Sequence, residues 1–127
     1  MGILIIDDDI DLRDSLRRAL EAEGYEAFCA ADGREALNLL RAPESRPCLV
    51  LLDIMMPVLN GLDFLELMAE DSDLRAIPVA VMTAHARERR DPAHASRSSG
   101  MFLRKPINLD TLLSLAERYC PRKTQPK

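Results

Sequence analysis

Short apolar runs alternate along the chain with segments in which apolar residues repeat at helical spacing. The clearest run is Leu49–Leu52, four aliphatic residues followed directly by Asp53. A strand that is buried on both faces of a parallel sheet has this continuous apolar pattern. The expected strands are Ile3–Ile6, Tyr25–Ala30, Leu49–Leu52, Pro78–Met82 and Met101–Leu103.

Helices are expected between these strands. Their apolar stripes run through residues 12–20, 35–40, 64–68 and 109–119. We expect Asp9 or Asp11 to cap the first helix and Gly24 to end it. The segment 86–99 contains Pro92 and few apolar residues, so its helix is predicted to be short or irregular. We also expect this segment to be the least ordered part of the domain.

The alternation of strands and helices predicts an α/β fold, a doubly wound five-stranded parallel sheet with five helices on its two faces. Residues 1–120 are expected to form the domain, and residues 121–127 a C-terminal tail or the stump of a linker. Ligands of such open sheets bind outside the carboxyl ends of the strands. Candidate functional residues are therefore sought where the strands end.

Polar residues with complementary chemistry follow four of the expected strands. They are Asp7, Asp8 and Asp9, then Asp53, Thr83 and Lys105. Several carboxylates in one crevice repel one another unless a cation lies among them, and hard oxygen ligands suit Mg²⁺. A lysine and a hydroxyl at the same edge can hold phosphoryl oxygens, and an aspartate beside Mg²⁺ is a credible phosphoryl acceptor. The strand ends therefore predict a magnesium-dependent phosphoacceptor site.

Composition excludes several classes of function. The chain has 127 residues, of which 47% are hydrophobic and 30% charged, and its net charge is −4. This acidic balance argues against direct binding of nucleic acid. No apolar run is long enough to span a membrane, and the N-terminus lacks the layout of a signal peptide. We therefore expect a cytoplasmic protein.

The cysteines and histidines do not have the spacing of a metal site. Cys29, Cys48 and Cys120 form no CxxC pair, and His85 and His94 are not at ligand spacing with any of them. All three cysteines are expected to be inert thiols in the core or at the surface. A zinc site is set aside.

Four motifs occur in order, each at the end of its own expected strand. They are residues 3–9, Leu51–Pro57 with Gly61, Met82–Ala84, and Lys105-Pro106. Together they resemble the receiver domain of two-component response regulators, and the resemblance extends from about Ile3 to Tyr119. It implies a flavodoxin-like strand order, 2-1-3-4-5. It also implies a signalling switch and not an enzyme, one that catalyses only its own phosphorylation and dephosphorylation.

The resemblance implies a role for each acidic position. Asp53 would accept the phosphoryl group from the phosphohistidine of a histidine kinase or a phosphotransfer protein. Asp8 would ligate Mg²⁺ directly and Asp7 mostly through water. Asp53 and the backbone carbonyl of Met55 would complete the protein's share of the metal ligands.

The remaining motif positions would hold and report the phosphoryl group. Thr83 and Lys105 would each bind one phosphoryl oxygen, and the Lys105-Pro106 peptide would be cis, which orients the lysine. Thr83 and Phe102 would form the switch that converts the added charge into a changed surface for an unknown output partner. Plain core packing stays open as the role of Phe102. The domain would be a monomer or a weak phosphorylation-dependent dimer, without direct contact to nucleic acid or a membrane.

The segment before the fifth strand departs from the family pattern. Ser98 and Ser99 stand where a Gly-Ala pair normally closes the fourth helix. The nearby face, the usual output surface of the family, carries five arginines: Arg87, Arg89, Arg90, Arg97 and Arg104. A solvated loop with scattered charge is favoured here over a site for an acidic partner.

Two positions bear on the lifetime of the phosphorylated state. Met55 and His85 stand two residues beyond Asp53 and Thr83, where residues of the family influence hydrolysis. Met55 cannot position a water molecule, and the change His85→Ala is expected to lengthen the phosphorylated state. Ala84 is small, as access of the donor histidine to the acceptor would require.

Competing interpretations are weaker on the same residues. A haloacid-dehalogenase-like phosphohydrolase needs a second aspartate two residues after its nucleophile, where Met55 stands. A pseudo-receiver that binds partners without phosphorylation has no need of the complete set of polar strand ends. A dinucleotide-binding domain needs a glycine-rich turn after the first strand, where carboxylates stand. Asp7 and Asp8 acting only as helix caps is a further alternative.

Overall fold

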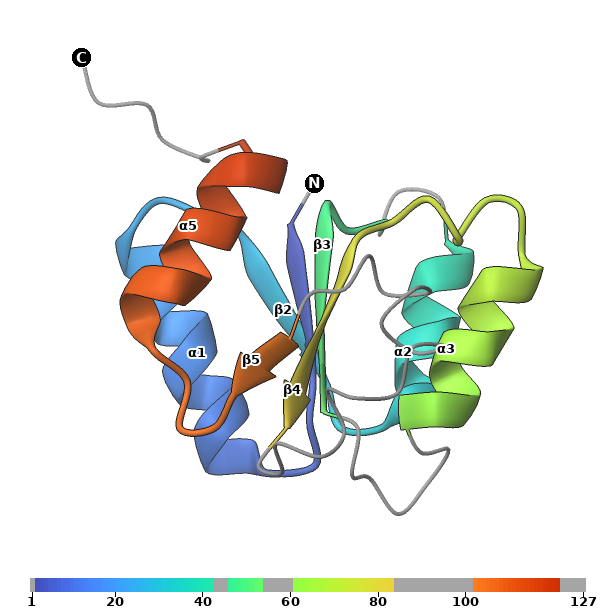
Figure 1. Cartoon of the computed structure of the whole chain (residues 1–127), viewed down its shortest axis with the longest axis horizontal. Coiled ribbons are helices and arrows are strands. Elements are labelled where there is room, and N and C mark those ends of the chain that lie inside the picture. The colour runs from blue at the N-terminus through green and yellow to red at the C-terminus, as the bar shows by residue number, and fades with distance from the viewer. Residues whose placement is uncertain (1, 43–45, 54–60, 84–101, 122–127) are drawn as a thin grey trace.

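The fold is a five-stranded parallel sheet covered by helices on both faces (Figure 1). The computed structural model of the chain describes residues 2–42, 46–53, 61–83 and 102–121. The strand order is β2-β1-β3-β4-β5, which confirms the predicted topology. The strands are β1 (Ile3–Ile6), β2 (Ala27–Ala30), β3 (Leu49–Asp53), β4 (Val79–Thr83) and β5 (Phe102–Arg104).

Four helices are described, two on each face of the sheet (Figure 1). They are α1 (Ile10–Ala22), α2 (Gly33–Arg41), α3 (Gly61–Glu70) and α5 (Leu109–Tyr119). The α1 and α5 helices cover one face, and α2 and α3 cover the other. The predicted fourth helix, with the arginines at 87–97 and the Ser98-Ser99 departure, falls in residues 84–101, outside the described part of the chain.

Alternation along the strands divides the core into two apolar clusters. In β1, Leu4 and Ile6 join the cluster beneath α2 and α3, whereas Ile3 and Ile5 join the one beneath α1 and α5. All four side chains are fully buried. Successive side chains of a strand point to opposite faces, so a strand covered on both sides must be apolar throughout. The same rule leaves only the strand ends free for polar chemistry.

The boundaries of α1 follow from its caps. The Asp9 side chain accepts hydrogen bonds from the backbone N–H groups of Asp11 and Leu12, which confirms the predicted cap. At the other end Gly24 has a φ of 92°, the left-handed conformation that ends a helix. Its N–H donates to the carbonyl of Glu21, and the N–H of Tyr25 donates to the carbonyl of Leu20. These two bonds form a Schellman motif.

The Schellman motif explains why β2 is shorter than predicted. A strand from Tyr25 was expected, but the structure begins β2 at Ala27. Because the N–H of Tyr25 closes the end of α1, it is not available to a strand ladder. The Tyr25 side chain still joins the core, with an exposed fraction of 2%. The apolar pattern therefore identified a core residue correctly and its backbone conformation wrongly.

The other described boundaries lie within three residues of the predicted ones. Strand β4 begins after Pro78, whose carbonyl accepts from the N–H of Val50. Helix α2 begins at Gly33 because Asp32 caps it, with its side chain accepting from the N–H of Glu35. The Glu35 carboxylate in turn accepts from the N–H of Ala31, two residues before the observed start of α2.

The prediction that all three cysteines are free thiols is wrong for two of them. Cys48 and Cys120 form a disulfide, with their Cα atoms 5.4 Å apart, and Cys29 is free. The two partners are separated by 72 positions in the sequence. The parallel sheet brings the start of β3 next to the end of α5, and spacing along the chain does not show this proximity.

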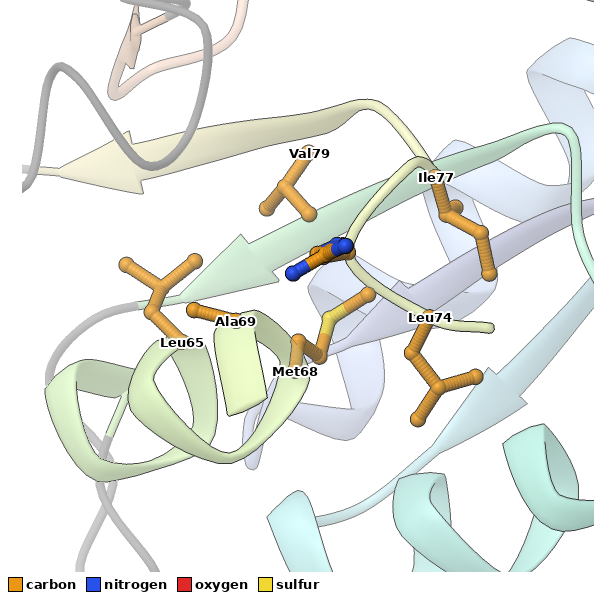
Figure 2. A pocket seen from close by; sticks show the side chains of 7 residues that line it. Leu65, Met68, Ala69, Leu74, Ile77 and Val79 are labelled. Atoms are coloured by element: carbon orange, nitrogen blue, oxygen red, sulfur yellow. The ribbon is translucent and has the colours of Figure 1, made fainter. Parts of the chain in front are cut away.

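A small apolar pocket lies between α3 and the segment that leads into β4 (Figure 2). It is lined by Leu65, Met68, Leu74 and Val79, all members of the core cluster beneath α2 and α3, and by Arg75. Among the residues around it only Arg75 carries charge or a reactive group. The pocket is the outer end of a core cluster and lies away from the strand ends that carry the polar residues.

Candidate functional site

Three strands bring buried polar side chains to one edge of the sheet. Asp7 follows β1 directly, Asp53 ends β3 and Thr83 ends β4. Their exposed fractions are 0%, 4% and 1%, and these are the buried polar or charged residues of the described chain. Since parallel strands place their carboxyl ends at the same edge, the topology alone accounts for their meeting. The structure thus brings these three predicted side chains together at the predicted edge of the sheet.

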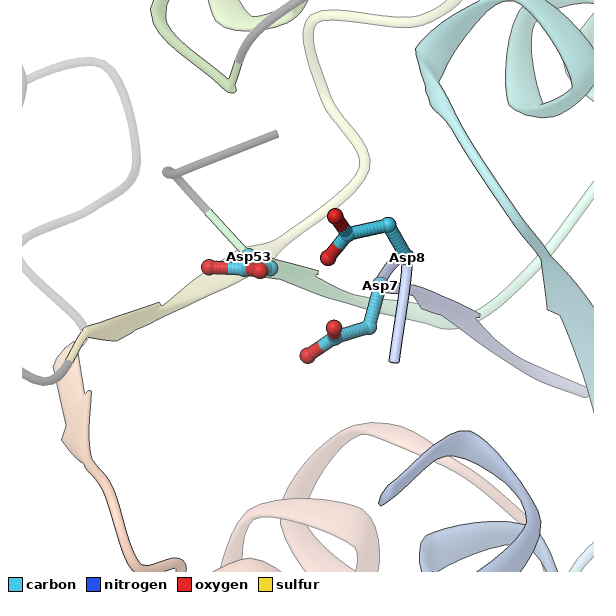
Figure 3. Close-up of side chains that lie close together, drawn as sticks. All are labelled: Asp7, Asp8 and Asp53. Carbon is cyan, nitrogen blue, oxygen red and sulfur yellow. The ribbon is translucent and has the colours of Figure 1, made fainter. Parts of the chain in front are cut away.

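The three carboxylates of Asp7, Asp8 and Asp53 converge at this edge (Figure 3). Each offers one oxygen, and these oxygens lie within 4.8 Å of one another. Asp7 and Asp53 are buried, whereas Asp8 is exposed, so the acidic cluster opens to solvent on the side of Asp8. Carboxylates this close raise each other's electrostatic energy unless a cation lies nearby.

Lys105 supplies one positive charge to the acidic cluster. Its Nζ lies 3.1 Å from Oδ2 of Asp7 and 3.5 Å from Oδ2 of Asp53. Burial by itself lowers the pKa of Lys105, but the hydrogen bond to Asp7 and the charges of Asp53 and Asp7 outweigh it and raise the pKa above its ordinary value of 10.5. The lysine is therefore charged at any physiological pH.

The path of the chain after β5 directs Lys105 toward the cluster. The N–H of Lys105 donates to the carbonyl of Thr83 at 2.8 Å, which extends the β4–β5 pairing to the end of the two strands. The Lys105-Pro106 peptide is cis, as predicted. Helix α5 then begins after Asn108, whose side chain accepts from the N–H of Thr111.

The donor set fits a hard divalent cation. Three carboxylates and one ammonium leave two net negative charges, which a divalent cation would balance. Mg²⁺ prefers carboxylate oxygens from only a few residues together with water, whereas softer metals prefer sulfur or nitrogen ligands. The acidic cluster can therefore hold a metal ion with Asp7, Asp8 and Asp53 as its ligands.

Arg13 contacts this site, and the sequence had not indicated it. Its Nη1 donates to the backbone carbonyl of Asp7 at 2.7 Å from the second turn of α1. The N–H of Asp9 donates to Oδ1 of Asp7 at 2.9 Å. These two bonds fix the backbone and the side chain of Asp7. The only signal in the sequence is a basic residue six positions after Asp7, and that alone is unremarkable.

The alternative that Asp7 and Asp8 act only as helix caps is wrong for Asp7. The cap of α1 is Asp9, while the Asp7 carboxylate is paired with Lys105. Phe102 is partly buried and packs against the cluster beneath α2 and α3. This packing agrees with either a switch or a plain core role for Phe102. The predicted carbonyl ligand from Met55, and the positions Ala84 and His85, lie outside the described residues.

The fold and the acidic edge together define the class of the protein. A parallel sheet of order 2-1-3-4-5, with paired acids after β1, an aspartate ending β3 and a lysine after β5, is the architecture of a receiver domain. A family model described as the response regulator receiver domain matches residues 3–117. The chain therefore belongs to the receiver-domain family of response regulators, which act in two-component signalling with a kinase and an output partner.

Relatives of two lengths match the chain. It is 39% identical to the response regulator MprA of Mycolicibacterium vanbaalenii over 122 residues, which cover 96% of this chain and 51% of that protein. It is 35% identical to an uncharacterized 14.6 kDa protein of Leptolyngbya boryana, covering 94% of this chain and 90% of that one. The chain thus spans about half the length of the MprA relatives and nearly all of a shorter one.

Solved structures of the family have the same fold. The receiver domain of NtrX from Brucella abortus is 31% identical, with a TM-score of 0.80, and the match covers 93% of this chain and 97% of that one.

Within the described residues, none of the helices combines the length and the apolar character needed to cross a membrane.

Proposed function

We propose that this domain is a Mg²⁺-dependent phosphoacceptor that takes a phosphoryl group onto Asp53 from a phosphohistidine of a kinase or a phosphotransfer protein. The observation that carries the proposal is the position of the Asp53 carboxylate. It lies within 4.8 Å of the carboxylates of Asp7 and Asp8 and 3.5 Å from the Lys105 ammonium. An aspartate held between metal ligands and a fixed cation can act as a nucleophile toward phosphorus.

The transfer moves one phosphoryl group between two nucleophiles. A carboxylate oxygen of Asp53 attacks phosphorus, a P–O bond forms, and the P–N bond to the donor imidazole breaks with its electron pair returning to nitrogen. Asp7, Asp8 and Asp53 would hold the Mg²⁺, which when bound supplies positive charge close to the transferred group. Asp7 also keeps Lys105 in place through their 3.1 Å contact.

Lys105 and Thr83 act on the phosphoryl oxygens in this proposal. The Lys105 ammonium is already directed at Asp53 and remains charged, so it can pair with an oxygen of the transferred group. The Thr83 hydroxyl ends the neighbouring strand, one residue beyond Met82, which pairs with Asp53. A phosphoryl group adds roughly −1.5 to −2 charge at neutral pH, and Lys105 and Thr83 are the side chains proposed to bind its oxygens.

The signal leaves the site through β4 and β5. Phe102 on β5 pairs in register with Val81 on β4, and Val81 lies two residues before Thr83. A shift of Thr83 toward the phosphoryl group would change the space beside Phe102, which would then repack and alter the surface that an output partner reads. On this proposal the domain catalyses only its own phosphorylation and dephosphorylation. Its cytoplasmic location and its partners stay predictions.

The experiment is intact-mass spectrometry after incubation with acetyl phosphate and Mg²⁺. Wild-type protein is expected to gain a single phosphate adduct, which is lost when Mg²⁺ is chelated. The Asp53→Asn variant is expected to show only background, because its amide is not a nucleophile. Asp110→Asn is the matched control, since Asp110 is an exposed aspartate on α5 and its loss leaves the site intact.

Other outcomes would contradict the proposal. An adduct that persists in Asp53→Asn would mean that another side chain is the acceptor. No adduct on the wild type, with Mg²⁺ binding confirmed separately, would favour a pseudo-receiver that binds partners without phosphorylation.

A further inference from the structure

We propose that Cys48 and Cys120 form a redox-reversible thiol pair that holds or releases the C-terminal end of α5. Cys48 lies directly before β3, and Cys120 is the C-cap residue directly after α5. They are bonded in the fold, with Cα atoms 5.4 Å apart. The pair lies at the opposite edge of the sheet from the acidic cluster, and the proposal does not depend on the phosphoacceptor function.

The backbone holds the two cysteines together independently of the sulfur–sulfur bond. The N–H of Cys48 donates to the carbonyl of Gly2 at 2.8 Å, so Cys48 is anchored to the sheet. The N–H of Cys120 donates to the carbonyl of Ala116 at 2.8 Å, so Cys120 is anchored to the helix. Helix and sheet are joined by the core, in which Leu112 and Ala116 are fully buried. The reduced protein therefore keeps both thiols within bonding range.

The surroundings of the pair accommodate both redox states. Both cysteines belong to the apolar cluster beneath α1 and α5, and their exposed fractions are 6% and 8%. A free thiol in such a place behaves as a small apolar side chain, so reduction leaves no buried charge and no unsatisfied polar group. The domain also has two large apolar clusters, so it is not one of the small folds that need a disulfide to stay folded.

A redox reagent would reach the pair through the sulfur of Cys120. It follows the last turn of α5 and precedes Pro121, which is exposed, whereas Cys48 lies between the sheet and the helix. Helix ends open locally at much lower cost than the whole fold, and opening of this turn would expose the sulfur of Cys120. The disulfide in turn opposes that opening, because it ties Cys120 to the sheet.

The chemistry is thiol–disulfide exchange with a low-molecular-weight disulfide such as glutathione disulfide. The Cys120 thiolate attacks one sulfur of the reagent, forms a mixed disulfide and releases one thiolate. The Cys48 thiolate then attacks the Cys120 sulfur, which forms the protein disulfide and releases the second thiolate. The two protons of the protein thiols end on the two released thiols. Excess reduced glutathione drives the same steps backwards.

The first test counts thiols across a series of glutathione buffers. Full-length protein is equilibrated with each buffer, starting once from the oxidised and once from the reduced form. It is then unfolded in denaturant that contains iodoacetamide, and its intact mass is measured. Cys29 is the free cysteine of the chain, so one alkylated thiol is expected under oxidising conditions and three under reducing conditions. Cys29→Ser is the matched variant, for which the counts become none and two. Both starting states must reach the same distribution at each ratio.

The second test measures hydrogen exchange of the last turn of α5. The backbone amides of residues 116–120 are expected to exchange about tenfold or more faster in the reduced protein. Amides in the middle of β3 serve as an internal reference and are expected to be unchanged. The double variant Cys48→Ala, Cys120→Ala is expected to exchange equally in both buffers, at the rate of the reduced wild type.

Three results would overturn the proposal. A pair that stays oxidised in excess reduced glutathione would be a permanent crosslink. A pair that stays reduced in excess glutathione disulfide would not form the bond at all. Equal exchange rates of the α5 amides in the two redox states would mean that the disulfide does not hold the helix end.

Discussion

Lys105 connects two buried carboxylates that originate from different strands. Its Nζ contacts Asp7 at 3.1 Å and Asp53 at 3.5 Å, and its side chain is 24% exposed. Two acids in this position depend on a nearby positive charge, because burial removes the water that would otherwise solvate them. Without a bound cation Lys105 is the positive side chain that contacts both within the described residues.

The raised pKa of Lys105 makes its contribution to stability dependent on pH in a defined direction. A lysine whose pKa is higher in the folded than in the unfolded protein stabilises the fold fully below its unfolded pKa of about 10.5. That contribution is lost as pH rises through the folded value. Metal-free wild type is therefore expected to exceed Lys105→Gln in free energy of unfolding by a constant amount from neutral pH to about 10.5, and by less above it.

Urea unfolding across this pH range checks the prediction. Arg104→Gln is the matched control, because Arg104 is the adjacent, exposed basic residue and no shift of stability with pH is expected for its removal. A difference between wild type and Lys105→Gln that stays constant well above pH 10.5 would contradict the raised pKa.

At the scale of residues, the sequence predicted the members of the site because topology leaves few places for them. Asp7, Asp53 and Thr83 each end an apolar run, and a parallel sheet brings such ends to one edge. Arg13 was missed because its role depends on a side chain reaching back to the carbonyl of Asp7, which no pattern of apolar spacing encodes. The paired cysteines were missed for a similar reason, since their proximity is a property of the assembled fold.

Each helix whose N-cap residue lies in the described part of the chain is preceded by an acidic or amide side chain that accepts hydrogen bonds from the first turn. Asp9 caps α1, Asp32 caps α2 and Asn108 caps α5. Each cap satisfies N–H groups that the helix itself leaves without partners. Asp9 follows Asp7 and Asp8 directly in the sequence. One short acidic run therefore supplies both the cap of α1 (Asp9) and two carboxylates of the acidic cluster (Asp7 and Asp8).

Removal of the α1 cap is expected to lower stability without removing a carboxylate from the acidic cluster. Asp9→Ala loses the acceptor for the N–H groups of Asp11 and Leu12, at a cost of about 1 kcal/mol in the free energy of unfolding. Asp9→Ser keeps a capping oxygen and is expected to retain most of the stability. Denaturant unfolding compares the two, and equal losses would show that capping is not what Asp9 contributes.

The bounds of helices and strands were predicted well where the apolar pattern and the capping residues agree, and less well where they disagree. The α5 bounds match because an apolar stripe, an Asn cap and a polar exposed face agree. Tyr25 was placed in a strand because it is apolar and buried, but its N–H serves the Schellman motif of α1. Local capping decides backbone conformation there, and burial decides only where the side chain lies.

The whole molecule is a sheet with two apolar faces and one polar edge. The carboxylates of the acidic cluster come from the ends of β1 and β3, which are separated by more than 40 positions in sequence. Such ligands are assembled only when the sheet is formed, so a cation that binds them stabilises the folded state by mass action. Global stability is therefore a direct readout of the acidic cluster.

Mg²⁺ is expected to raise the melting temperature of the protein, and chelation to reverse the rise. At about a hundred times the Kd the stabilisation would be about 2.7 kcal/mol. Asp8→Asn is expected to show a much smaller rise, because one ligand is lost. In metal-free buffer the same variant is expected to be as stable as wild type or more so, by up to about 1 kcal/mol, since one repulsive charge is removed.

Thermal unfolding with and without Mg²⁺ distinguishes these expectations. Asp11→Asn is the control, because Asp11 is an exposed acid in the first turn of α1 and does not belong to the acidic cluster. A full Mg²⁺ response in Asp8→Asn would remove Asp8 from the ligand set.

The direction of the strands also determines what can be attached to the domain. Gly2 and Cys120 lie at the edge where β3 begins, and the acidic cluster lies where it ends (Figure 1). A tag, a fluorescent reporter or a further folded unit that is joined before Gly2 or after Cys120 leaves the described domain at the edge opposite Asp53. A bulky phosphodonor could then approach Asp53 without meeting the attached cargo, so a fused reporter need not slow transfer.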